Sequence, residues 1–470
     1  MKRRDFLKTG SLAALGGMLL TPFGAKANTI KEEFRGRKAK NIIFMVSDGM
    51  SVGTMIMADI YLKRKNGKSS NWVGLYEDNL VQRALMDMAS ANAIVTDSAA
   101  ASSSWGGGVR VNNGSLNVSP NGKENMPILQ KFKQAGKKVG CVTTVPITHA
   151  TPAGFCVTSK RRNAMDHIAE QYAELNFDVM MGGGSQYFDK DKRKDKKDVF
   201  DLFVKKGYTV AKTKSEMLSA PKNKPILGTF DEDAVPYTVD HLRDEKASKN
   251  IPTLAEMAQK AIDQMKDHKN GFALQIEGGK VDWAAHGNDI AALLFDQIAF
   301  DEAVKVVMDF AKKDKNTLVV ITSDHGNANP GLIYGGKTND NFDHLQKFTH
   351  SNDWILQGIH ASSSTSFVKD RIAEACGGFA ITDEQAKELL SYYNNLKKED
   401  GLYNHKNLPF RALAEMQKAY TSVGWISMDH SSDYTELAMY GPGSENLKSF
   451  VRNTDMHNFL LNAAHVENKF

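Results

Sequence analysis

The sequence predicts an α/β fold, a three-layer αβα sandwich with a central, mostly parallel sheet and an inserted helical region near the active face. Short apolar runs recur along the chain, and such runs are typical of strands that are buried on both faces. Helical patterns with one apolar face lie between these runs. Because alternating strands and helices favour a parallel sheet with helices on both sides, this order predicts three layers.

The apolar runs that we expect to form strands lie between residues 41 and 323. They are 41–47, 92–96, 137–145, 178–184, 272–277 and 317–323. A helix is predicted between the last two, where one face carries Ile290, Leu293, Leu294 and Ile298. Residues 335–428 lack the strand rhythm and contain helix-like stretches, so we interpret them as an insertion over the active face.

Residues 1–27 have the pattern of a cleaved twin-arginine export signal. Arg3 and Arg4 precede a modest apolar stretch, which ends in the small-residue pattern Ala25-Lys26-Ala27. The alternative, an amphipathic first helix of the folded domain, is disfavoured because the stretch holds several glycines. The stretch is also shorter than the roughly 20 apolar residues that span a membrane. We therefore expect a periplasmic or secreted protein without a membrane anchor.

The charge pattern argues against a nucleic-acid partner. The signal holds five basic residues and one acidic residue, so the formal net charge falls from +5 to +1 without it. The Lys-rich run 189–198 alternates in sign, which is typical of a solvated loop rather than of a basic stripe. The three cysteines, Cys141, Cys156 and Cys376, are too few for a disulfide framework. Cys141 lies inside an apparent strand, where we expect a buried, inert thiol.

Acidic residues and a histidine stand at the ends of predicted strands. Asp48, Glu277 and the pair Asp324-His325 each close or follow an apolar run. Because ligands of parallel sheets bind beyond the carboxyl ends of the strands, these side chains indicate a common site. A single Asp in such a place is more often a helix cap or a turn residue, and that interpretation stays open for each one taken alone.

Two further histidines and a carboxylate have features of metal ligands. Asp282 and His286 are four residues apart, so a helix would place them on one face. His430 stands beside a strand-like segment late in the chain. Carboxylate together with imidazole suits zinc, whereas an all-oxygen set suits magnesium. Such an oxygen set is available in Asp48, Thr151 and Glu277.

Ser98 stands between the predicted strand 92–96 and an Ala-rich, helix-competent run. A serine in this place is most often a helix N-cap. The alternative is a nucleophile, because a hydroxyl at a helix N-terminus beside a dication can lose its proton and attack phosphorus. Arg161 and Arg162 are ordinary solvated arginines by one interpretation. By another, one of the two guanidinium groups forks onto phosphate oxygens.

Taken in order, these motifs resemble the alkaline phosphatases over most of the chain that follows residue 27. The resemblance is carried by Asp48-Gly-Met, Val-Thr-Asp-Ser98-Ala-Ala, His149-Ala-Thr-Pro-Ala-Gly, the Gly run 182–184, Glu277-x4-Asp282-x3-His286, Thr-Ser-Asp324-His-Gly and a late histidine before a strand. Each motif is weak alone, whereas their order and spacing together are specific.

The resemblance implies a catalytic domain, residues 28–470, with three metal sites. One zinc ion would be held by Asp282, His286 and His430. A second zinc ion would be held by Asp48, Asp324 and His325 and would contact Ser98. A magnesium ion would be held by Asp48, Thr151 and Glu277. The resemblance also implies that Arg162 binds phosphate and that Asp97 orients the nucleophile. His149 and Trp283 stand where members of the family vary, and each would tune the magnesium site and the binding of phosphate.

The implied activity is hydrolysis of small-molecule phosphate monoesters by in-line attack of Ser98, through a phosphoserine intermediate. The two zinc ions would serve as clamp, Lewis acid and generator of the nucleophiles, and Arg162 would spread the charge of the transferring group. The family resemblance alone also implies a homodimer.

Two alternatives stay open: a related enzyme on the same metal-bearing sheet, and a protein of another functional class. A sulfatase needs Cys or Ser followed by x-Pro-x-Arg, whereas Ser98 is followed by alanines, and the related phosphodiesterases generally use Thr and lack the third metal site. A catalytically inactive metal- or phosphate-binding protein would have a lost nucleophile or a broken ligand set, whereas every position is filled here.

Overall fold

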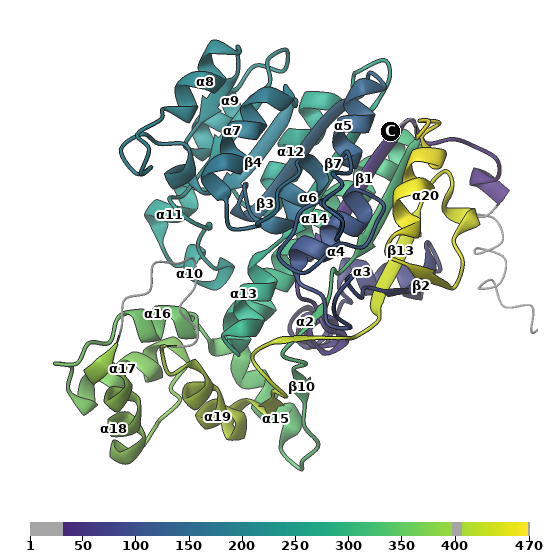
Figure 1. Ribbon diagram of the computed structural model, residues 1–470. Helices are drawn as coiled ribbons and strands as arrows, with labels where there is room; N and C mark the ends of the chain where they lie inside the picture. The colour runs from purple at the N-terminus through teal and green to yellow at the C-terminus, as the bar shows by residue number, and fades with distance from the viewer. Residues whose placement is uncertain (1–31, 397–406, 469–470) are drawn as a thin grey trace, which may run out of the picture.

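The computed structural model describes residues 32–396 and 407–468 (Figure 1). The predicted export signal, residues 1–27, lies outside these described residues. Among the helices within them, none is both long enough and apolar enough to cross a lipid bilayer.

Within the described residues, ten strands form one sheet, in the order β14-β2-β13-β8-β1-β7-β3-β4-β6-β5. The strands are β1 (Asn41–Ser47), β2 (Gln82–Asp87), β3 (Lys138–Pro146), β4 (Val179–Gly183), β5 (Thr209–Ala211), β6 (Ile226–Thr229), β7 (Phe272–Gly278), β8 (Thr317–Thr322), β13 (Thr435–Tyr440) and β14 (Phe450–Arg452). From β8 to β5 all neighbours pair in parallel, whereas β13 is antiparallel to both of its neighbours. The predicted mostly parallel sheet is confirmed.

The central strands are buried along their whole length. Every residue of β1, β7 and β8 is buried. A continuous apolar run marks such a strand because its side chains pack against helices on both faces of the sheet. The runs predicted for these three strands, and those for β3 and β4, are confirmed to within one residue at each end.

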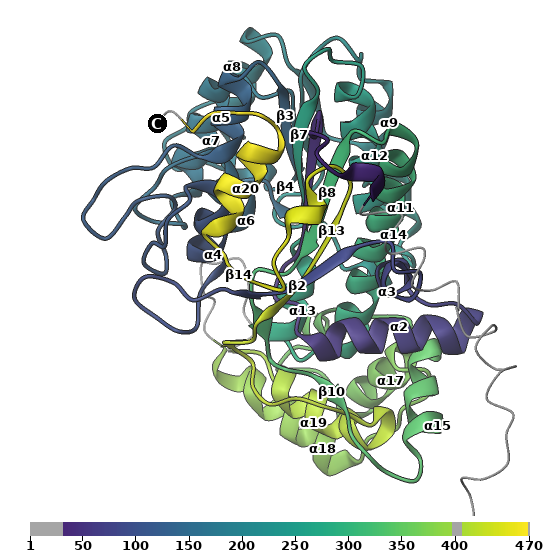
Figure 2. The same cartoon turned by 90° about the vertical axis from the view of Figure 1, so that its right-hand side faces the viewer.

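Helices cover both faces of the sheet, as Figure 2 shows. One layer contains α4 (Ser98–Gly106), α5 (Ile128–Gln134), α6 (Ala150–Cys156), α7 (Met165–Leu175), α8 (Val199–Lys205) and α20 (Asp455–Ala463). The opposite layer contains α2 (Val52–Asn66), α3 (Asn71–Glu77), α9 (Lys214–Ser219), α12 (Leu254–Met265) and α14 (Ile290–Asp314). Phe44 belongs to the apolar core of the first side and Met45 to that of the second, as the alternation of side chains along a strand requires. The three layers are confirmed.

The backbones of α4 and α6 approach each other closely. A Cβ atom on Gly154 would overlap with Ser102, and one on Gly106 would overlap with the carbonyl oxygen of Gly154. The hydroxyl of Ser102 donates to the carbonyl of Ala150 at 3.1 Å, which links the two helices directly. Glycine at positions 106 and 154 therefore permits the close approach of α4 and α6.

The helices of residues 335–428 gather beyond the carboxyl ends of the central strands (Figure 1). They are α15 (Thr338–Asp343), α16 (Asn352–Gln357), α17 (Thr365–Ala375), α18 (Asp383–Ser391) and α19 (Phe410–Thr421). Their buried residues, among them Leu356, Ile372 and Leu413, belong to the same apolar cluster as those of α12 and α14. The described part of this region is therefore mainly helical, as expected, and its core is continuous with that of the sheet.

The strand predicted at 92–96 is wrong, because these residues form a loop before α4. Ile94 is 80% exposed, so the apolar run does not enter the core. The strand of this region is β2, further upstream, and its sequence gives a weak signal since several of its residues are exposed or half-buried.

Candidate active site

The carboxyl ends of three neighbouring strands bring acidic residues together. Asp48 follows β1, Glu277 lies at the end of β7, and Asp324 lies two residues after β8. Since β1 lies between β7 and β8, with Val46 paired to both Glu277 and Thr322, the three carboxylates meet at one edge of the sheet. All three are buried.

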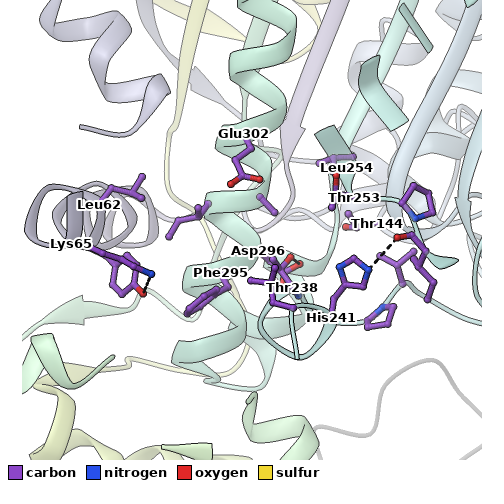
Figure 3. A pocket seen from close by; sticks show the side chains of 18 of the residues that line it. Leu62, Lys65, Thr144, Thr238, His241, Thr253, Leu254, Phe295, Asp296 and Glu302 are labelled. Atoms are coloured by element: carbon purple, nitrogen blue, oxygen red, sulfur yellow. Dashed lines mark hydrogen bonds between the residues drawn. The ribbon is translucent and has the colours of Figure 1, made fainter. Parts of the chain in front are cut away.

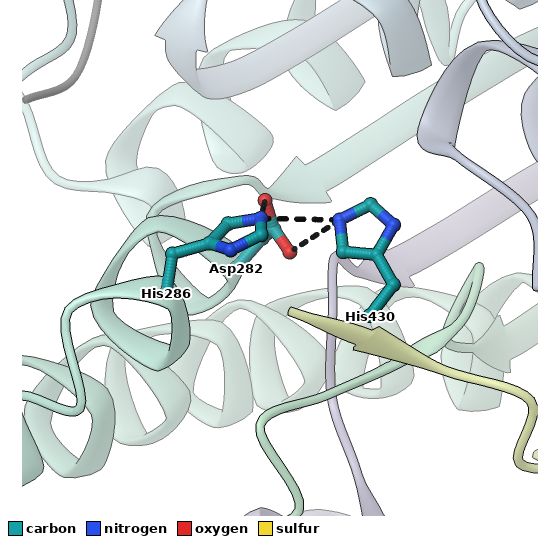
Figure 4. A group of neighbouring side chains, drawn as sticks. All are labelled: Asp282, His286 and His430. Carbon is teal, nitrogen blue, oxygen red and sulfur yellow. Dashed lines mark hydrogen bonds and ion pairs between the residues drawn. The ribbon is translucent and has the colours of Figure 1, made fainter. Parts of the chain in front are cut away.

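The first group of candidate metal ligands consists of Asp282, His286 and His430 (Figure 4). Asp282 and His286 lie on one face of α13 (Lys280–His286), as their spacing predicts, and His430 comes from the short strand β12 (His430–Ser431). The Nε2 atoms of the two histidines are 3.1 Å apart, and each lies 3.5 Å from an oxygen of Asp282.

Backbone carbonyls orient both of these imidazoles. Nδ1 of His286 lies 2.6 Å from the carbonyl oxygen of Met428, and Nδ1 of His430 lies 3.0 Å from that of Thr96. An Nδ1 proton held on a carbonyl leaves the Nε2 lone pair free to bind a metal ion. Two such nitrogens beside a carboxylate fit a zinc ion.

The second group, Asp48, Asp324 and His325, lies around Ser98. Nε2 of His325 is 3.2 Å from Ser98 Oγ, 3.3 Å from Asp324 Oδ2 and 3.6 Å from Asp48 Oδ1. Within the described residues, Asp48 Oδ1 and Asp324 Oδ2 are buried without a hydrogen-bond partner. Buried anionic oxygens are costly unless a charge balances them, so this pair fits a cation. The carboxylate of Asp282 also approaches Asp48 and His325, so Asp282 lies between the first two groups.

The third group shares Asp48 and adds Glu277 and Thr151. Thr151, on α6, donates to Asp48 Oδ2 at 3.1 Å, and Thr143 donates to Glu277 Oε2 at 2.5 Å. Glu277 Oε1 is buried and has no hydrogen-bond partner among the described residues. These oxygens fit a magnesium ion. The ring of His149 lies within reach of the same group.

Burial sets the protonation of the three strand-end carboxylates. Desolvation, with repulsion from Asp324 next, holds the pKa of Asp48 well above its usual range. Desolvation likewise raises the pKa of Asp324 and that of Glu277 to about 7. A cation among these groups would favour their ionised forms and offset the raised pKa values.

Asp282 behaves differently from the strand-end carboxylates. Burial acts against its ionisation, but the neighbouring His286 and His430 hold its pKa below the usual range. His325 is also fully buried, and desolvation lowers its pKa well below the usual value. Its imidazole is therefore neutral, which is the form that coordinates a metal.

Ser98 is the first residue of α4, and the N-cap of this helix is Asp97. Asp97 Oδ1 accepts a hydrogen bond from the backbone N–H of Ala100 at 2.9 Å. The interpretation of Ser98 as an N-cap is therefore wrong, because its neighbour fills that place. The hydroxyl of Ser98 instead faces His325 at the positive end of the helix, where an anion is favoured.

Arg162 lies across an open cavity of about 490 Å³ that Ser98 and Trp283 also line. Its Nη1 donates to Asp97 Oδ2 at 3.0 Å and its Nη2 to His149 Nε2 at 3.1 Å. A guanidinium only donates, so Nε2 of His149 is an acceptor. Burial, then the charge of Arg162, lowers the pKa of His149 to about 3, so the ring is neutral. Trp283 meets that ring edge-on, at 6.0 Å between centroids.

Arg161, in contrast, is exposed and does not line the cavity. The structure thus brings all of the predicted site residues together. Of the two adjacent arginines, Arg162 is the one that lines the cavity.

Several supporting residues escape prediction. The side-chain amide of Asn327 donates to Asp282 Oδ1 at 2.7 Å, and Thr143 holds Glu277. Gly49 has a positive φ of 67°, and a Cβ atom there would overlap with Asp282. Their positions in the sequence were the only signals that could have pointed to them: Asn327 lies three residues after Asp324, and Gly49 directly follows Asp48.

A second cavity, of about 240 Å³, is lined by α2, α10 (Thr238–His241), α12 and α14 (Figure 3). Its walls are mainly apolar, and two of its polar side chains, Asp296 and His241, are hydrogen-bonded. Asp296 accepts hydrogen bonds from the N–H and the hydroxyl of Thr238, and His241 Nε2 lies 3.2 Å from the carbonyl of Ile251. Among the described residues, this cavity has no group of carboxylates and imidazoles like the one at the carboxyl ends of the central strands.

The sheet and the acid–imidazole groups at its carboxyl edge, beside a serine and an arginine, define a metal-dependent hydrolase of the α/β class. The family model described as "Alkaline phosphatase" matches residues 39–466. Alkaline phosphatase 4 of Bacillus subtilis is 31% identical, over 90% of this chain and 88% of its own. The crystal structure of Thermus thermophilus alkaline phosphatase superposes with a TM-score of 0.85 at 30% identity, covering 92% of each chain.

The chain belongs to the alkaline phosphatase family, whose members are metal-dependent phosphomonoesterases. Alkaline phosphatase of Escherichia coli is a further relative, 29% identical over 70% of this chain and 82% of its own. The family resemblance and the enzyme class predicted from the sequence are confirmed.

Proposed function

We propose that the enzyme hydrolyses phosphate monoesters through a phosphoserine at Ser98, in a centre that holds two zinc ions and one magnesium ion. The observation that carries this proposal is the position of Ser98. Its hydroxyl lies at the N-terminus of α4, 3.2 Å from His325 Nε2, and shares a cavity with Arg162.

The ligand chemistry supports the assignment of the metals. One zinc ion is held by Asp282, His286 and His430. The other is held by Asp48, Asp324 and His325, and the magnesium ion by Asp48, Thr151 and Glu277. When bound, these ions supply Lewis acidity at the substrate oxygens and favour the ionised serine.

The chain's own groups position the reaction. Arg162 donates two hydrogen bonds to the phosphate and matches the planar spread of its charge. Asp97 holds that guanidinium and caps α4, so one carboxylate fixes both the arginine and the helix that carries the nucleophile. Ser98 Oγ then forms a bond to phosphorus as the bond to the ester oxygen breaks. Water hydrolyses the resulting phosphoserine and releases inorganic phosphate.

His149 and Trp283 have a tuning role in this proposal. His149 contacts Arg162 and lies beside the third ligand group, while Trp283 packs against its ring at the cavity wall. Their size and hydrogen bonding adjust how firmly phosphate and magnesium are held.

Export and assembly form part of the same proposal. The twin-arginine pattern of residues 1–27 supports a periplasmic or secreted protein without a membrane anchor. Small phosphate monoesters are its substrates, and we expect no nucleic-acid partner. The family resemblance supports a homodimer, which light scattering of the purified protein would test.

One assay tests the activity. Purified protein is given p-nitrophenyl phosphate, the bis-ester and the sulfate, each with and without added zinc and magnesium, and Ser98→Ala serves as the control. We expect the monoester to be the preferred substrate and the variant to be inactive. Preference for the bis-ester or the sulfate would support the alternative enzymes, and no turnover at all would support a binding protein.

A further inference from the structure

The segment that leads into the nucleophile receives no support from the sheet. Residues 92–97 form a loop, and none of their backbone groups belongs to a strand ladder of the described residues. Three of these groups lie directly before Ser98: the carbonyls of Val95 and Thr96 and the N–H of Asp97. Their hydrogen-bond partners therefore decide where Ser98 is held.

The side chain of Asn113 satisfies two of the three. Its Nδ2 donates to the carbonyl of Val95 at 3.0 Å, and its Oδ1 accepts from the N–H of Asp97 at 3.2 Å. One side-chain amide therefore binds both a carbonyl and an N–H of the segment, which no strand of the sheet pairs with. The carbonyl of Thr96 points to the other side, where it meets Nδ1 of His430 at 3.0 Å.

The backbone around Asn113 is anchored to the same groups. The N–H of Asn113 donates to Asn92 Oδ1 at 2.9 Å. The N–H of Gly114 donates to Asp97 Oδ2 at 2.9 Å, and the carbonyl of Gly114 accepts from the N–H of Arg162 at 2.8 Å. Asn113 therefore stands where the loop of the nucleophile, the helix cap and the phosphate-binding arginine meet.

We infer that Asn113 is a positioning residue of the phosphatase reaction. Its amide fixes Val95–Asp97 in the conformation that aims Ser98 Oγ at the site between His325 and Arg162. Asn113 also borders the cavity, and its amide acts on Ser98 through the backbone groups of Val95 and Asp97. A small displacement of a nucleophile lowers the rate strongly, because in-line attack requires the reacting atoms at a defined distance and angle. This inference rests on the role of Ser98 proposed above.

The test compares Asn113→Ala with Asn112→Ala, a matched control one residue away. We expect Asn113→Ala to lower kcat for p-nitrophenyl phosphate about tenfold, since it removes two hydrogen bonds from the segment. Inhibition by inorganic phosphate should change less than about threefold, because Arg162 stays in place. Asn112→Ala should change neither. Asn113→Asp keeps an acceptor for the N–H of Asp97 but sets a carboxylate oxygen against the carbonyl of Val95, so it should not restore the activity that Asn113→Ala loses.

The outcomes separate this inference from the proposed function. Equal kcat for Asn113→Ala and Asn112→Ala would overturn it, and so would a parallel loss of turnover and phosphate inhibition, which would mean general damage to the pocket. An inactive unmodified enzyme would refute the proposed function itself. Because Asn113 is exposed, we expect all the variants to fold, and the melting temperature checks this.

Discussion

The two adjacent arginines allow a sharp test of the phosphate site. Replacing Arg162 with Ala removes a guanidinium that Asp97 and His149 hold at 3.0 and 3.1 Å, facing the cavity beside Ser98. The fold should tolerate the change, because Asp97 keeps its hydrogen bonds from the N–H groups of Ala100 and Gly114. The effect should therefore fall on the reaction and not on stability.

The magnitude follows from the charge that Arg162 neutralises. Loss of a donor to a developing oxyanion costs on the order of 3 kcal/mol, which is roughly a hundredfold in rate. The carboxylate of Asp97 would also lose the positive charge of Arg162 and would repel the phosphate. A hundredfold loss of rate is therefore a lower bound. Arg161 is exposed, and Arg161→Ala should change the rate less than about threefold.

The assay measures kcat/KM for p-nitrophenyl phosphate and the inhibition constant of inorganic phosphate for both variants. Arg162→Ala should lower kcat/KM and raise the inhibition constant of inorganic phosphate. Arg162→Lys should restore them in part, because a point charge lacks the planar fork. If Arg161→Ala proves the damaging change, or if Arg162→Ala stays within threefold of the unmodified enzyme, the reasoning is refuted.

Three further expectations concern metals, pH and export. Chelation should abolish activity and zinc with magnesium should restore it, with about two zinc ions per chain by metal analysis; full activity of metal-free protein would contradict this. In metal-free protein the pKa of Asp324 and that of Glu277 are raised to about 7, whereas an unfolded carboxyl titrates near about 4, so the folded state binds more protons between these values. The melting temperature of metal-free protein should therefore fall as the pH rises from about 4 to about 7 and then level off, and a rise over that range would count against the burial argument. Replacing Arg3 and Arg4 with Lys should leave the protein inside the cell in a fractionation experiment, and normal export of that variant would exclude the twin-arginine route.

The sequence predicts the central strands well because burial on both faces forces a continuous apolar run. β1, β7 and β8 are of this kind, and each begins at the predicted residue. The loop 92–96 has a similar composition but a different environment, since Ile94 is exposed and Val95 lines the cavity. Composition alone does not distinguish an apolar wall of a cavity from an apolar core.

The candidate ligands are predictable for a related reason. Asp48 directly follows β1, Asp324 lies two residues after β8, and Asp282 is at helical spacing from His286, so a local pattern suffices to find these three. Asn113 and Asn327 could not be found in this way. Asn113 binds backbone groups of residues sixteen and eighteen positions earlier, and Asn327 binds a carboxylate forty-five positions earlier. Contacts of this kind depend on the folded path of the chain.

The close contact between α4 and α6 limits how this site can change. Ser98 begins one helix and Thr151 lies in the other, and the distance between the helices is set where Gly106 meets the carbonyl oxygen of Gly154 and where Gly154 meets Ser102. Because a Cβ atom on either glycine would overlap with the facing helix, even one added methyl group would shift Ser98 and Thr151 relative to each other. Trp283 stands instead on the cavity wall, where a smaller side chain would enlarge the space for substrate without a change at the contact between α4 and α6. Substitutions that alter substrate preference are therefore expected at the cavity wall, for example at Trp283, and not at the contact between α4 and α6.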